Sequence, residues 1–511
     1  MATIYNTAYE YFTKHVEGRE KCLSYFGRTF SGNEVKERID GVAAFLREKG
    51  IKRGDVVAIH LPNTPECIFS IYAINKLGAV SFVTHPMLPV QALKESLTET
   101  GAKLLIVMDH LAEEVGIPKI VCDGISYLPA VKRGFAKVVR KGGKAKGIRF
   151  PYRAKGDAVS AVGNTEDVAL YLPSGGTTGE PKVIRVTNSA FNANADATLT
   201  LAKMPLEGHA VLLLLPFFHG FGLSSSLHGA VSGGAEGVIF PYPDYPRAAK
   251  CVKRGKGDIL LAVPNMYKKL LAQKAFRKGI GNMRLAFSGG DTLPVSLKRE
   301  YDALSEKAGG ESRLYQGYGL AETVSVCVAN CPGSDKAGSI GKPVFSEVKI
   351  LSEEGAELPA GQVGEIAVAT PCMMKGYLGQ KDFCEKYLRT GDLGYFDQDG
   401  FLVFSGRKKR IIVIGGMNVY PLEIERVACE EDFAEGAAAL EYREDGKPKI
   451  ALFVAEHSPL PEKEKKDRIL KRLCGRIIRY AIPSKIVFLP ELPLTKVGKT
   501  DHAALLSYLG K

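Results

Sequence analysis

The sequence lacks any long hydrophobic run. None of its 511 residues lies in an apolar stretch approaching the roughly 20 that a membrane-spanning helix needs. The longest candidate, Ala210–Phe218 ("AVLLLLPFF"), is about half that length and predicts a buried strand. The N-terminal stretch "MATIYNTAYEYF" has no basic region followed by an apolar one, so no secretory signal is expected. We therefore expect a cytoplasmic protein.

Clustered cysteines are also missing. The ten cysteines are scattered and never form a CxxC pair. The nearest two, Cys327 and Cys331, have no further His or Cys close by that would complete a zinc site. Reduced thiols of a cytosolic protein are the simpler interpretation.

The charge is unbalanced, with 69 Lys and Arg against 56 Asp and Glu, or +13 at pH 7. Such an excess favours anionic partners, among them nucleotides, phosphorylated cofactors, nucleic acid and anionic lipid. No zinc-finger, RNP-type or helix-turn-helix pattern with base-reading residues is present. We therefore expect no nucleic-acid partner.

The first two thirds of the chain alternate helical and strand-like stretches. Val35–Gly50 has apolar residues at helical spacing, whereas Asp55–Leu61 and Lys103–Asp109 are short β-rich runs, and the pattern recurs between 210 and 290. Strands that alternate with helices predict largely parallel, helix-covered sheets. In such folds ligands gather at the carboxyl ends of the strands.

The predicted secondary structure changes from about residue 338. Short strands separated by Gly, Pro and acidic turns predict a small β subdomain or barrel. After Gly406–Arg410 ("GRKKR") an α+β pattern of the size of a separate small domain continues to the end. A chain of this length is expected to hold two to four domains.

The segment Tyr127–Gly156 carries ten Lys or Arg and no acidic residue. Part of it, between Leu128 and Arg140, has apolar residues on one helical face and basic residues elsewhere. A basic amphipathic helix of this kind can lie on an anionic membrane surface. One hypothesis is therefore peripheral contact with the inner face of the membrane through 127–156; the alternative is a solvated basic surface packed on the domain.

Leu172–Lys182 ("LPSGGTTGEPK") has the composition of a phosphate-binding loop. Consecutive glycines let backbone N–H groups approach a phosphate closely, Ser and Thr add donors, and Lys182 adds charge. The pattern is not GxxxxGK[ST], because Pro181 separates the last glycine from the lysine, and two predicted strands flank the loop. A glycine-rich turn without ligand is the alternative at this point.

Five further motifs follow the loop in order. They are Pro216–Gly222 ("PFFHGFG"), Tyr315–Thr323 ("YQGYGLAET"), Arg389–Arg410 ("RTGDLGYFDQDGFLVFSGRKKR"), Gly415–Glu425 ("GGMNVYPLEIE") and Leu492–Asp501 ("LPLTKVGKTD"). Together the six resemble the adenylate-forming superfamily of acyl-CoA synthetases, adenylation domains and luciferases over essentially the whole chain. The resemblance implies an α/β fold: a large N-terminal domain of two α/β subdomains plus a β-barrel, and a small mobile α+β C-terminal domain.

The resemblance also implies a reaction in two halves. A carboxylate attacks the α-phosphorus of ATP, giving an acyl-adenylate and pyrophosphate, and the thiol of coenzyme A then displaces AMP to give a thioester. The first half brings two anions together, so it needs positioning and cationic or N–H stabilisation more than acid–base chemistry. ATP, Mg²⁺ and coenzyme A are the implied co-reactants.

Residue roles are carried over position by position. The β,γ-phosphate loop is matched by Ser174, Gly175, Gly176, Thr177, Thr178, Gly179 and Lys182. The residues that resemble the adenine-side wall are Gly289, Gly290, Asp291, Gln316, Gly317 and Tyr318. Asp392 resembles the aspartate that binds the ribose, and Arg407 matches the arginine near the ribose and the phosphates. The implied catalytic residues are Lys499, which bridges carboxylate and α-phosphate, His219, between acyl site and reacting phosphate, and Glu322, which with Thr178 binds the metal ion.

The C-terminal domain is implied to swing between the half-reactions. Lys409 aligns with the hinge, so the predicted domains are 1–408 and 409–511. Gly415 and Gly416 align with the coenzyme A tunnel, where a side chain would narrow the passage. The swing lets one site use Lys499 for adenylation and the face around 415–418 for thioester formation.

Three positions depart from the family pattern. Ala321 stands where a Thr hydroxyl usually contacts the α-phosphate, and Thr323 is too far along to be assumed equivalent. Arg410 follows the hinge lysine where an acidic residue is common, and Asp501 replaces a frequent Arg.

The acyl pocket is expected around Phe217–Ser226, Ser288–Asp291 and Gly317–Val324. Its lining is apolar, small residues such as Gly220 and Gly222 are expected to leave room, and no Asp matches the one that holds an α-amino group. These features favour a fatty or aromatic carboxylate. The basic segment after Tyr127 and the stretch "GGMNVYPLEIE" resemble those of bacterial long-chain fatty acyl-CoA synthetases, and this resemblance favours a medium- or long-chain fatty acid. The alternatives are an aryl acid–CoA ligase, an acyl-AMP ligase that loads a separate carrier protein, and a non-enzymatic nucleotide-binding membrane scaffold. The sequence leaves the oligomeric state open.

Overall fold

The computed structural model describes most of the chain. The described residues are 5–111, 115–129, 147–152, 160–174, 182–414, 417–444, 447–474, 476–477, 479–494 and 500–510. Several predicted positions lie outside them: the loop residues Gly175, Gly176, Thr177, Thr178 and Gly179, the tunnel glycines Gly415 and Gly416, Lys499, and most of the basic segment 127–156.

An eight-stranded sheet forms the N-terminal layer, in the order β19-β9-β8-β4-β3-β5-β6-β7. Its strands are β3 Val56–His60, β4 Val80–Val83, β5 Ala102–Met108, β6 Lys119–Cys122, β7 Ile148–Arg149, β8 Val168–Pro173, β9 Val183–Thr187 and β19 Gly376–Tyr377. The neighbours from β8 to β7 pair in parallel, and only the pairings of β9 are antiparallel among the described residues.

A nine-stranded sheet follows, in the order β16-β15-β14-β13-β12-β10-β11-β1-β2. Its strands are β1 Leu23–Tyr25, β2 Arg28–Phe30, β10 Ala210–Leu213, β11 Glu236–Ile239, β12 Ile259–Ala262, β13 Leu285–Ser288, β14 Leu314–Gly319, β15 Val326–Ala329 and β16 Lys342–Pro343. The predicted strand "AVLLLLPFF" is thus β10 and its extension, with Val211–Leu214 at most 1% exposed.

Helices cover both sheets. They are α1 Ala8–Val16, α2 Gly32–Glu48, α3 Pro65–Lys76, α4 Val90–Thr100, α6 Asn188–Ala202, η2 Phe221–Gly229, α7 Ala230–Ser232, α8 Tyr245–Lys253, α9 Pro264–Leu271, α10 Lys274–Gly279 and α11 Val295–Lys307, with short turns at η1 Asp109–Leu111 and η3 Ile280–Asn282. Every residue of α3 is buried, including the polar residues Glu66, Ser70, Asn75 and Lys76; Thr64 caps the helix and Pro65 begins it. The predicted helix at 35–50 is α2, capped by Ser31.

A smaller antiparallel sheet follows, in the order β17-β18-β20-β21. Its strands are β17 Glu347–Leu351, β18 Gly364–Ala369, β20 Leu388–Phe396 and β21 Leu402–Arg407, and the turn η4 Ala321–Thr323 precedes it. The expected β-subdomain is therefore present. Its strand pairings form an open four-stranded sheet in the described part of the chain, because β17 and β21 are its two edges.

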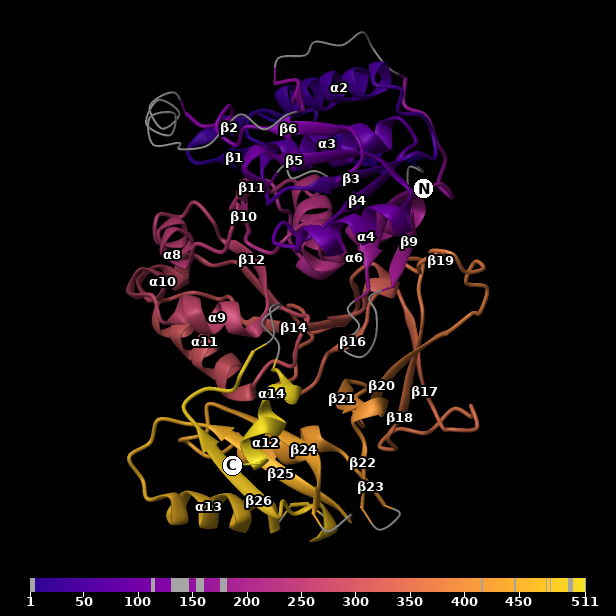
Figure 1. Ribbon diagram of the computed structural model, residues 1–511. Helices are drawn as coiled ribbons and strands as arrows, with labels where there is room; N and C mark the ends of the chain where they lie inside the picture. The colour runs from indigo at the N-terminus through magenta and orange to yellow at the C-terminus, as the bar shows by residue number, and fades with distance from the viewer. Residues whose placement is uncertain are drawn as a thin grey trace.

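The C-terminal elements pack around hydrophobic clusters of their own. They are η5 Lys408–Arg410, β22 Ile412–Ile414, β23 Met417–Val419, α12 Pro421–Ala428, β24 Gly436–Glu444, β25 Lys447–Ala455, α13 Glu462–Cys474, η6 Arg479–Ala481, β26 Lys485–Leu489, α14 His502–Leu506 and η7 Ser507–Gly510. The two clusters draw only on residues between 412 and 509. In Figure 1 these orange-to-yellow elements lie at the opposite end of the molecule from α2. A domain boundary between 408 and 409 stays a prediction.

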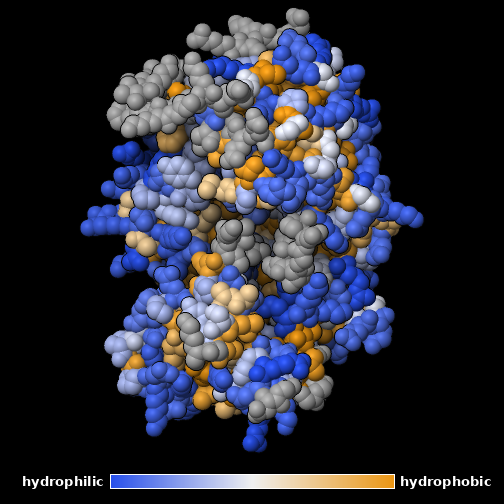
Figure 2. Space-filling model, viewed as in Figure 1, coloured by the Kyte–Doolittle hydropathy of each residue, from blue (hydrophilic) through white to orange (hydrophobic). Residues whose placement is uncertain are grey.

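The structure bears on two expectations from the sequence, that no segment spans a membrane and that the cysteines are reduced. On the face shown in Figure 2, hydrophobic residues are scattered among a majority of hydrophilic ones. In the described part of the chain, no helix combines the length and the apolar character that a membrane span requires. All ten cysteines are free thiols. Six of them are buried, at positions 22, 67, 122, 327, 331 and 372, while Cys251 and Cys429 are half-buried and Cys384 and Cys474 are exposed.

Candidate active site

In each of the two large sheets there is a point where the order of successive strands reverses direction, and a ligand is expected there. In the first sheet the chain passes from β3 to β4 on one side and then to β5 on the other. In the second sheet it passes from β10 to β11 on one side and then to β12 on the other. Crevices form at the carboxyl ends of strands at such reversals. Thr84 and His85 follow β4, and the "PFFHGFG" motif follows β10.

The glycine loop joins two strands, as the sequence predicts, and the structure shows that these strands, β8 and β9, are antiparallel. Pro173 at the end of β8 pairs with Val183 at the start of β9. The backbone N–H of Ser174 donates to the Lys182 carbonyl at 2.7 Å, and the Lys182 N–H donates to Ser174 Oγ at 2.9 Å. The two ends of the predicted phosphate loop are therefore held together, while its residues 175–181 lie outside the described part of the chain.

Tyr377 connects the end of this loop to Glu322. The Lys182 ammonium lies 4.7 Å from the centre of the Tyr377 ring, and the Tyr377 hydroxyl donates to Glu322 Oε1 at 3.0 Å. Burial, together with the neighbouring Glu322 carboxylate, raises the pKa of Tyr377. The hydroxyl thus stays protonated at neutral pH and keeps its donor role. Two residues predicted from motifs 140 positions apart in the chain therefore meet through one tyrosine.

Asp392 lies in a second polar group of the site. It is 3% exposed; the Tyr318 hydroxyl donates to its Oδ2 at 2.8 Å, and Arg407 Nε lies 3.3 Å from its Oδ1. Asp392 and Arg407 face each other across β20 and β21, so the sheet register itself sets this ion pair. Burial raises the pKa of Tyr318 well above its usual range, which keeps its hydroxyl a donor. Three predicted residues from three different strands are thus brought together.

Glu365 supports the part of β20 directly before Asp392. Its carboxylate accepts the Gly391 N–H at 3.1 Å and a two-nitrogen contact from Arg389 at 2.7 and 3.0 Å. Burial alone would raise the pKa of Glu365, but the hydrogen bonds from Arg389 and Gly391 outweigh it and lower the pKa. An ionised Glu365 therefore anchors the backbone that presents Asp392.

The predicted adenine-side wall lies at the ends of β13 and β14. Gln316 and Gly317 lie in β14, and Ser288 at the end of β13 pairs with Gln316. Gly290 has a φ of +79°, which favours glycine, and a Cβ on Gly289 would approach the Phe221 ring to 3.1 Å. These two glycines therefore have backbone and packing reasons to be glycine. Asp291 follows them, and its Oδ1 accepts the N–H of Thr292 at 2.8 Å.

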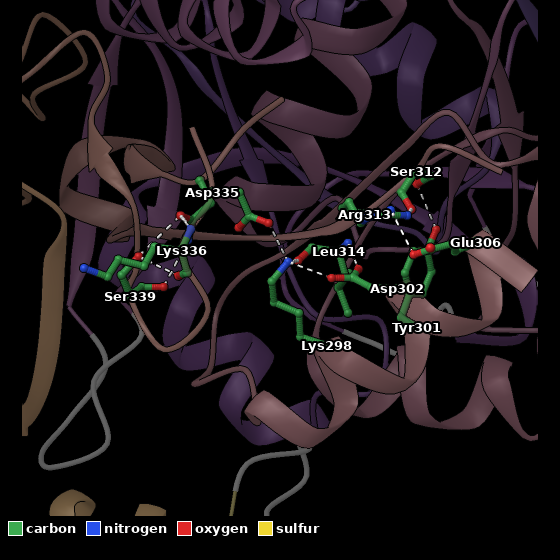
Figure 3. Close-up of polar contacts among 11 residues, drawn as sticks. Lys298, Tyr301, Asp302, Glu306, Ser312, Arg313, Leu314, Asp335, Lys336 and Ser339 are labelled. Carbon is green, nitrogen blue, oxygen red and sulfur yellow. Dashed lines mark hydrogen bonds and ion pairs between the residues drawn. The ribbon is translucent and has the colours of Figure 1, made fainter. Parts of the chain in front are cut away.

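A buried lysine holds the start of β14 in place (Figure 3). Lys298 of α11 donates to the Leu314 carbonyl at 2.9 Å and contacts Asp335 at 2.7 Å and Asp302 at 3.1 Å. Asp302 also accepts the Leu314 N–H at 2.8 Å. Both backbone groups of Leu314 are thus bound by α11, which positions the strand that carries Gln316 and Tyr318.

His219 lies on the surface of the site, directly before a π-helix. Its backbone carbonyl accepts the Leu223 N–H at 2.9 Å, and its ring lies 4.5 Å from that of Phe218. The π-helix η2 spans Phe221–Gly229, a geometry that is rare and concentrated at functional sites. The structure thus places His219 at the carboxyl side of β10, and its role between the acyl site and the reacting phosphate stays a prediction.

The small residues around η2 do not leave the space that the sequence led us to expect. A Cβ on Gly220 would lie 2.1 Å from the Val324 carbonyl oxygen, and one on Gly222 would lie 2.2 Å from the Pro216 carbonyl oxygen. Both glycines therefore permit close contact between backbones. Beyond them, Ser225 Oγ lies 3.0 Å from Ser325 Oγ, so this predicted wall of the acyl pocket also contains buried polar groups.

Residues 12–378 match the protein family described as "AMP-binding enzyme". This chain belongs to that family. A long-chain-fatty-acid–CoA ligase of Bacillus subtilis (strain 168) is 29% identical over 521 residues, covering 95% of this chain and 91% of the relative. A 2-succinylbenzoate–CoA ligase of Geobacillus sp. (strain WCH70) is 29% identical over 473 residues, covering 90% and 89%.

A solved structure supports the fold. The crystal structure of an anthranilate CoA ligase in complex with anthranoyl-AMP matches with a TM-score of 0.86 at 23% identity, covering 100% of this chain and 98% of that one. The predicted superfamily and fold class are confirmed, and so is the predicted enzyme class, an AMP-forming acyl-CoA synthetase. ATP or AMP binding belongs to this family membership.

The three departures from the family pattern have structural consequences that the sequence did not reveal. The Thr323 hydroxyl lies 3.1 Å from the backbone carbonyls of both Leu320 and Ser325 and donates its single proton to one of them at a time, so it does not replace the hydroxyl missing at Ala321. Asp501 is the N-cap of α14, where its carboxylate accepts the N–H of Ala504 at 3.0 Å.

Arg410, the third departure, is bound to the C-terminal elements. Its guanidinium contacts Glu425 Oε1 at 2.7 Å, and the same oxygen accepts the Ala439 N–H at 2.9 Å. Arg410 therefore ties the predicted hinge turn, which contains Lys409, to α12 and β24. An acidic residue at 410 would place two carboxylates together there.

Sequence reasoning missed Tyr377 and Glu365. Tyr377 lies 55 positions from the carboxylate it contacts, and Glu365 lies 26 from the amide it binds. Neither belongs to a spaced motif, so only the pairing of distant strands brings them to the site. Tyr377 lies in β19, which pairs with β9 as an edge strand of the first sheet, and this pairing brings Tyr377 to the site.

Proposed function

We propose that this enzyme joins a carboxylic acid to coenzyme A through an acyl-adenylate. A carboxylate oxygen attacks the α-phosphorus of ATP and the bond to pyrophosphate breaks; the thiolate sulfur of coenzyme A then attacks the acyl carbon and AMP leaves. The observation that carries the proposal is the arrangement of Asp392 between Tyr318 and Arg407. A buried, oriented carboxylate beside a guanidinium suits a ribose whose two hydroxyls donate and whose phosphates are anionic.

The first half-reaction needs cations around the triphosphate. Lys182 at the end of the glycine loop and Arg407 beside Asp392 supply two, and we assign Lys499 as a third, between the carboxylate and the α-phosphate. Together they offset the repulsion between the attacking carboxylate and ATP. The loop residues Ser174–Gly179 are proposed to hold the β- and γ-phosphates through their N–H and hydroxyl groups.

A magnesium ion that accompanies ATP fits the donors present. Glu322 is half-exposed beside Lys182, and Tyr377 donates to only its Oε1, so the carboxylate is oriented by one hydrogen bond. Carboxylate and hydroxyl oxygens are the ligands that Mg²⁺ prefers. We propose that Glu322 and Thr178 bind the ion, which would screen the phosphate charge.

The second half-reaction is proposed to use a different placement of the C-terminal domain, 409–511. Rotation about Lys409 would withdraw Lys499 and bring 415–418 to the site, with Gly415 and Gly416 lining the path of the pantetheine arm. Arg410 and Glu425 would move together with that domain, since their contact lies between the hinge turn and α12.

For the acid, a medium- or long-chain fatty acid remains our first proposal. The similarity to a long-chain-fatty-acid–CoA ligase over 95% of this chain supports it. An aryl acid is the second candidate, supported by the similarity to a 2-succinylbenzoate–CoA ligase. The tight contact of Gly220 with Val324 and the buried Ser225–Ser325 pair favour this smaller, more polar acid.

A panel of acids tests both candidates. Purified protein is incubated with ATP, Mg²⁺, coenzyme A and either saturated C6–C18 acids or benzoate, anthranilate and 2-succinylbenzoate, and AMP and thioester are measured. The highest kcat/KM identifies the class. Acid-dependent pyrophosphate release without thioester formation would instead favour loading of a separate carrier protein, and nucleotide binding without pyrophosphate release would favour a non-enzymatic scaffold.

A further inference from the structure

His85 follows β4, the strand that neighbours β8, and β8 leads into the glycine loop. β4 and β8 are parallel neighbours, and Phe82 of β4 is paired with Tyr171 of β8. His85 lies three positions beyond Phe82, and Ser174 lies three positions beyond Tyr171. Because adjacent strands are about 4.8 Å apart and both chains emerge at the same edge, the two residues start from neighbouring places.

The ring of His85 also contacts Phe218, which follows β10 of the second sheet. Its ring centre lies 4.4 Å from that of Phe218, with 41° between the ring planes. Phe218 directly precedes His219 and is 9% exposed, so its position is fixed by packing. His85 therefore follows the strand that neighbours β8, which leads into the predicted phosphate loop, and its ring contacts the aromatic residue beside His219.

A backbone hydrogen bond determines which nitrogen of the His85 ring carries the proton. The Met87 N–H donates to His85 Nδ1 at 2.9 Å, so Nδ1 is the acceptor and the neutral ring carries its proton on Nε2. Burial lowers the pKa of His85, which keeps the ring neutral at pH 7. The backbone thus orients one N–H donor, while the ring itself is only half-buried.

Two other histidines show what a purely structural role looks like in this protein. His60 at the end of β3 is 2% exposed, with its Nδ1 2.8 Å from the Thr84 hydroxyl. His228 in η2 is fully buried, with its two nitrogens beside the Tyr72 hydroxyl and the Asn192 amide oxygen. His85 differs from both because its ring is partly accessible at the carboxyl edge of the sheet.

We propose that His85 is a further substrate-binding residue, whose Nε2–H donates a hydrogen bond to an anionic oxygen of the bound reactants. The inference rests on the proposed adenylation reaction. Two oxygens have the required chemistry: a phosphate oxygen of ATP, on the side of Ser174, and the carboxylate of the acid, on the side of Phe218. A neutral donor fits a site that already holds several cations, because it binds an anion without adding charge.

The test compares His85→Leu with His85→Gln. Leucine keeps the contact with Phe218 but has no donor, whereas the Gln amide restores an N–H near the position of Nε2. We expect His85→Leu to lower kcat/KM for acid-dependent pyrophosphate release about 10- to 100-fold, the scale for losing a hydrogen bond to a charged group. His85→Gln should recover to within about fivefold of wild type. An increase in KM for ATP identifies the phosphate as partner, and an increase in KM for the acid identifies the carboxylate.

The controls separate this inference from the proposed function. His209→Leu removes another half-buried histidine, which contacts Asp258 at the amino end of β10, and should leave activity unchanged. Thermal unfolding midpoints check that each variant folds. An active wild type with an unimpaired His85→Leu variant, or a loss that His85→Gln shares fully, overturns the role of His85 alone. A wild type that releases no pyrophosphate with any acid overturns the proposed reaction as well.

Discussion

Tyr377 is the residue on which the geometry around Glu322 depends. Its hydroxyl orients one carboxylate oxygen, and its ring receives the Lys182 ammonium. Residues that orient a metal ligand through a hydrogen bond typically change metal affinity about 10- to 100-fold when they are lost. The proposed metal site therefore predicts a specific defect when this one hydroxyl is removed.

Tyr377→Phe should raise the Mg²⁺ concentration needed for half-maximal adenylation about tenfold, because Glu322 loses its orienting donor. The ring and its contact with Lys182 stay in place, so KM for the acid should change little. Titration of pyrophosphate release with Mg²⁺ measures both. Tyr387→Phe is the matched control, since that tyrosine hydrogen-bonds Glu347 in the exposed part of the β17–β20 region. Equal Mg²⁺ requirements in the two variants would remove Tyr377 from the metal site.

Lys499 is the residue whose role can be tested most directly by kinetics. Lys499→Ala should lower the adenylation rate about 10²- to 10³-fold, the scale for losing one preorganised charge stabiliser. The thioester step, started from added acyl-adenylate, should be affected far less, because the proposed rotation removes Lys499 from the site. Pyrophosphate exchange within a few-fold of wild type would refute the assignment.

At the scale of elements, β14 depends on its attachment to α11. Lys298 joins the Leu314 carbonyl to two carboxylates, and these contacts lie only two to four positions from Gln316 and Tyr318. The strand is therefore held at its start by charged groups and at its sides by β13 and β15. Losing the buried cation would leave Asp302 and Asp335 close together without compensation.

Lys298→Met should weaken ATP binding as well as stability. We expect the free energy of unfolding to fall by about 1–3 kcal/mol, the range for a charged hydrogen-bonding group removed from a buried site. Hydrogen exchange should accelerate at the amides of β14, and KM for ATP should rise. Lys307→Met, an exposed position on the same helix, is the control and should change neither quantity. Faster exchange spread evenly over the whole chain would argue against a local role.

The basic segment 127–156 is the second element that carries a prediction. If it contacts an anionic membrane, the fourfold change Lys132, Arg133, Lys137 and Arg140→Gln should lower co-sedimentation with phosphatidylserine vesicles at least tenfold, since each basic residue near such a surface contributes about 1 kcal/mol. The control replaces Lys250, Lys253, Arg254 and Lys256 by Gln, which removes the same charge from the exposed end of α8. Equal binding of the two variants would favour a solvated basic surface.

At the scale of the whole molecule, one exposed ion pair connects the nucleotide-binding part to the C-terminal elements. Lys268 of α9 lies 2.7 Å from Glu435, just before β24, and the two side chains are 61% and 40% exposed. Such a pair is weak and screened by salt. It is therefore suited to stabilising one of the two placements that we propose for the C-terminal elements without preventing the other.

Lys268→Glu should slow one half-reaction and leave the other nearly unchanged. A pair worth about 0.2–1 kcal/mol changes a population by about 1.4- to fivefold, so the ratio of adenylation to thioester formation should move within that range. The combined reversal Lys268→Glu and Glu435→Lys should restore the ratio, and 0.5 M salt should reduce the effect. If both half-reactions slowed equally, the pair would act on folding and not on domain placement.

The sequence by itself determined the chemistry that this protein can offer. Glycines, hydroxyls and a lysine in Leu172–Lys182, and the carboxylates Glu322 and Asp392 in their motifs, are local features that spacing along the chain preserves. Alternating strands and helices likewise predicted parallel sheets, because hydrophobic periodicity reports burial directly. The resemblance of these motifs predicted the superfamily, and the match of residues 12–378 to the AMP-binding enzyme family confirmed it.

Only the tertiary structure decided which groups meet. Tyr377 reaches Glu322 because β19 joins the edge of the first sheet, and His85, which follows β4 of the first sheet, contacts Phe218, which follows β10 of the second. It also decided that Gly220 serves close contact with Val324 and not an open pocket. Contacts of this kind depend on strand pairing between distant segments, and side-chain periodicity within one segment carries no information about its partner.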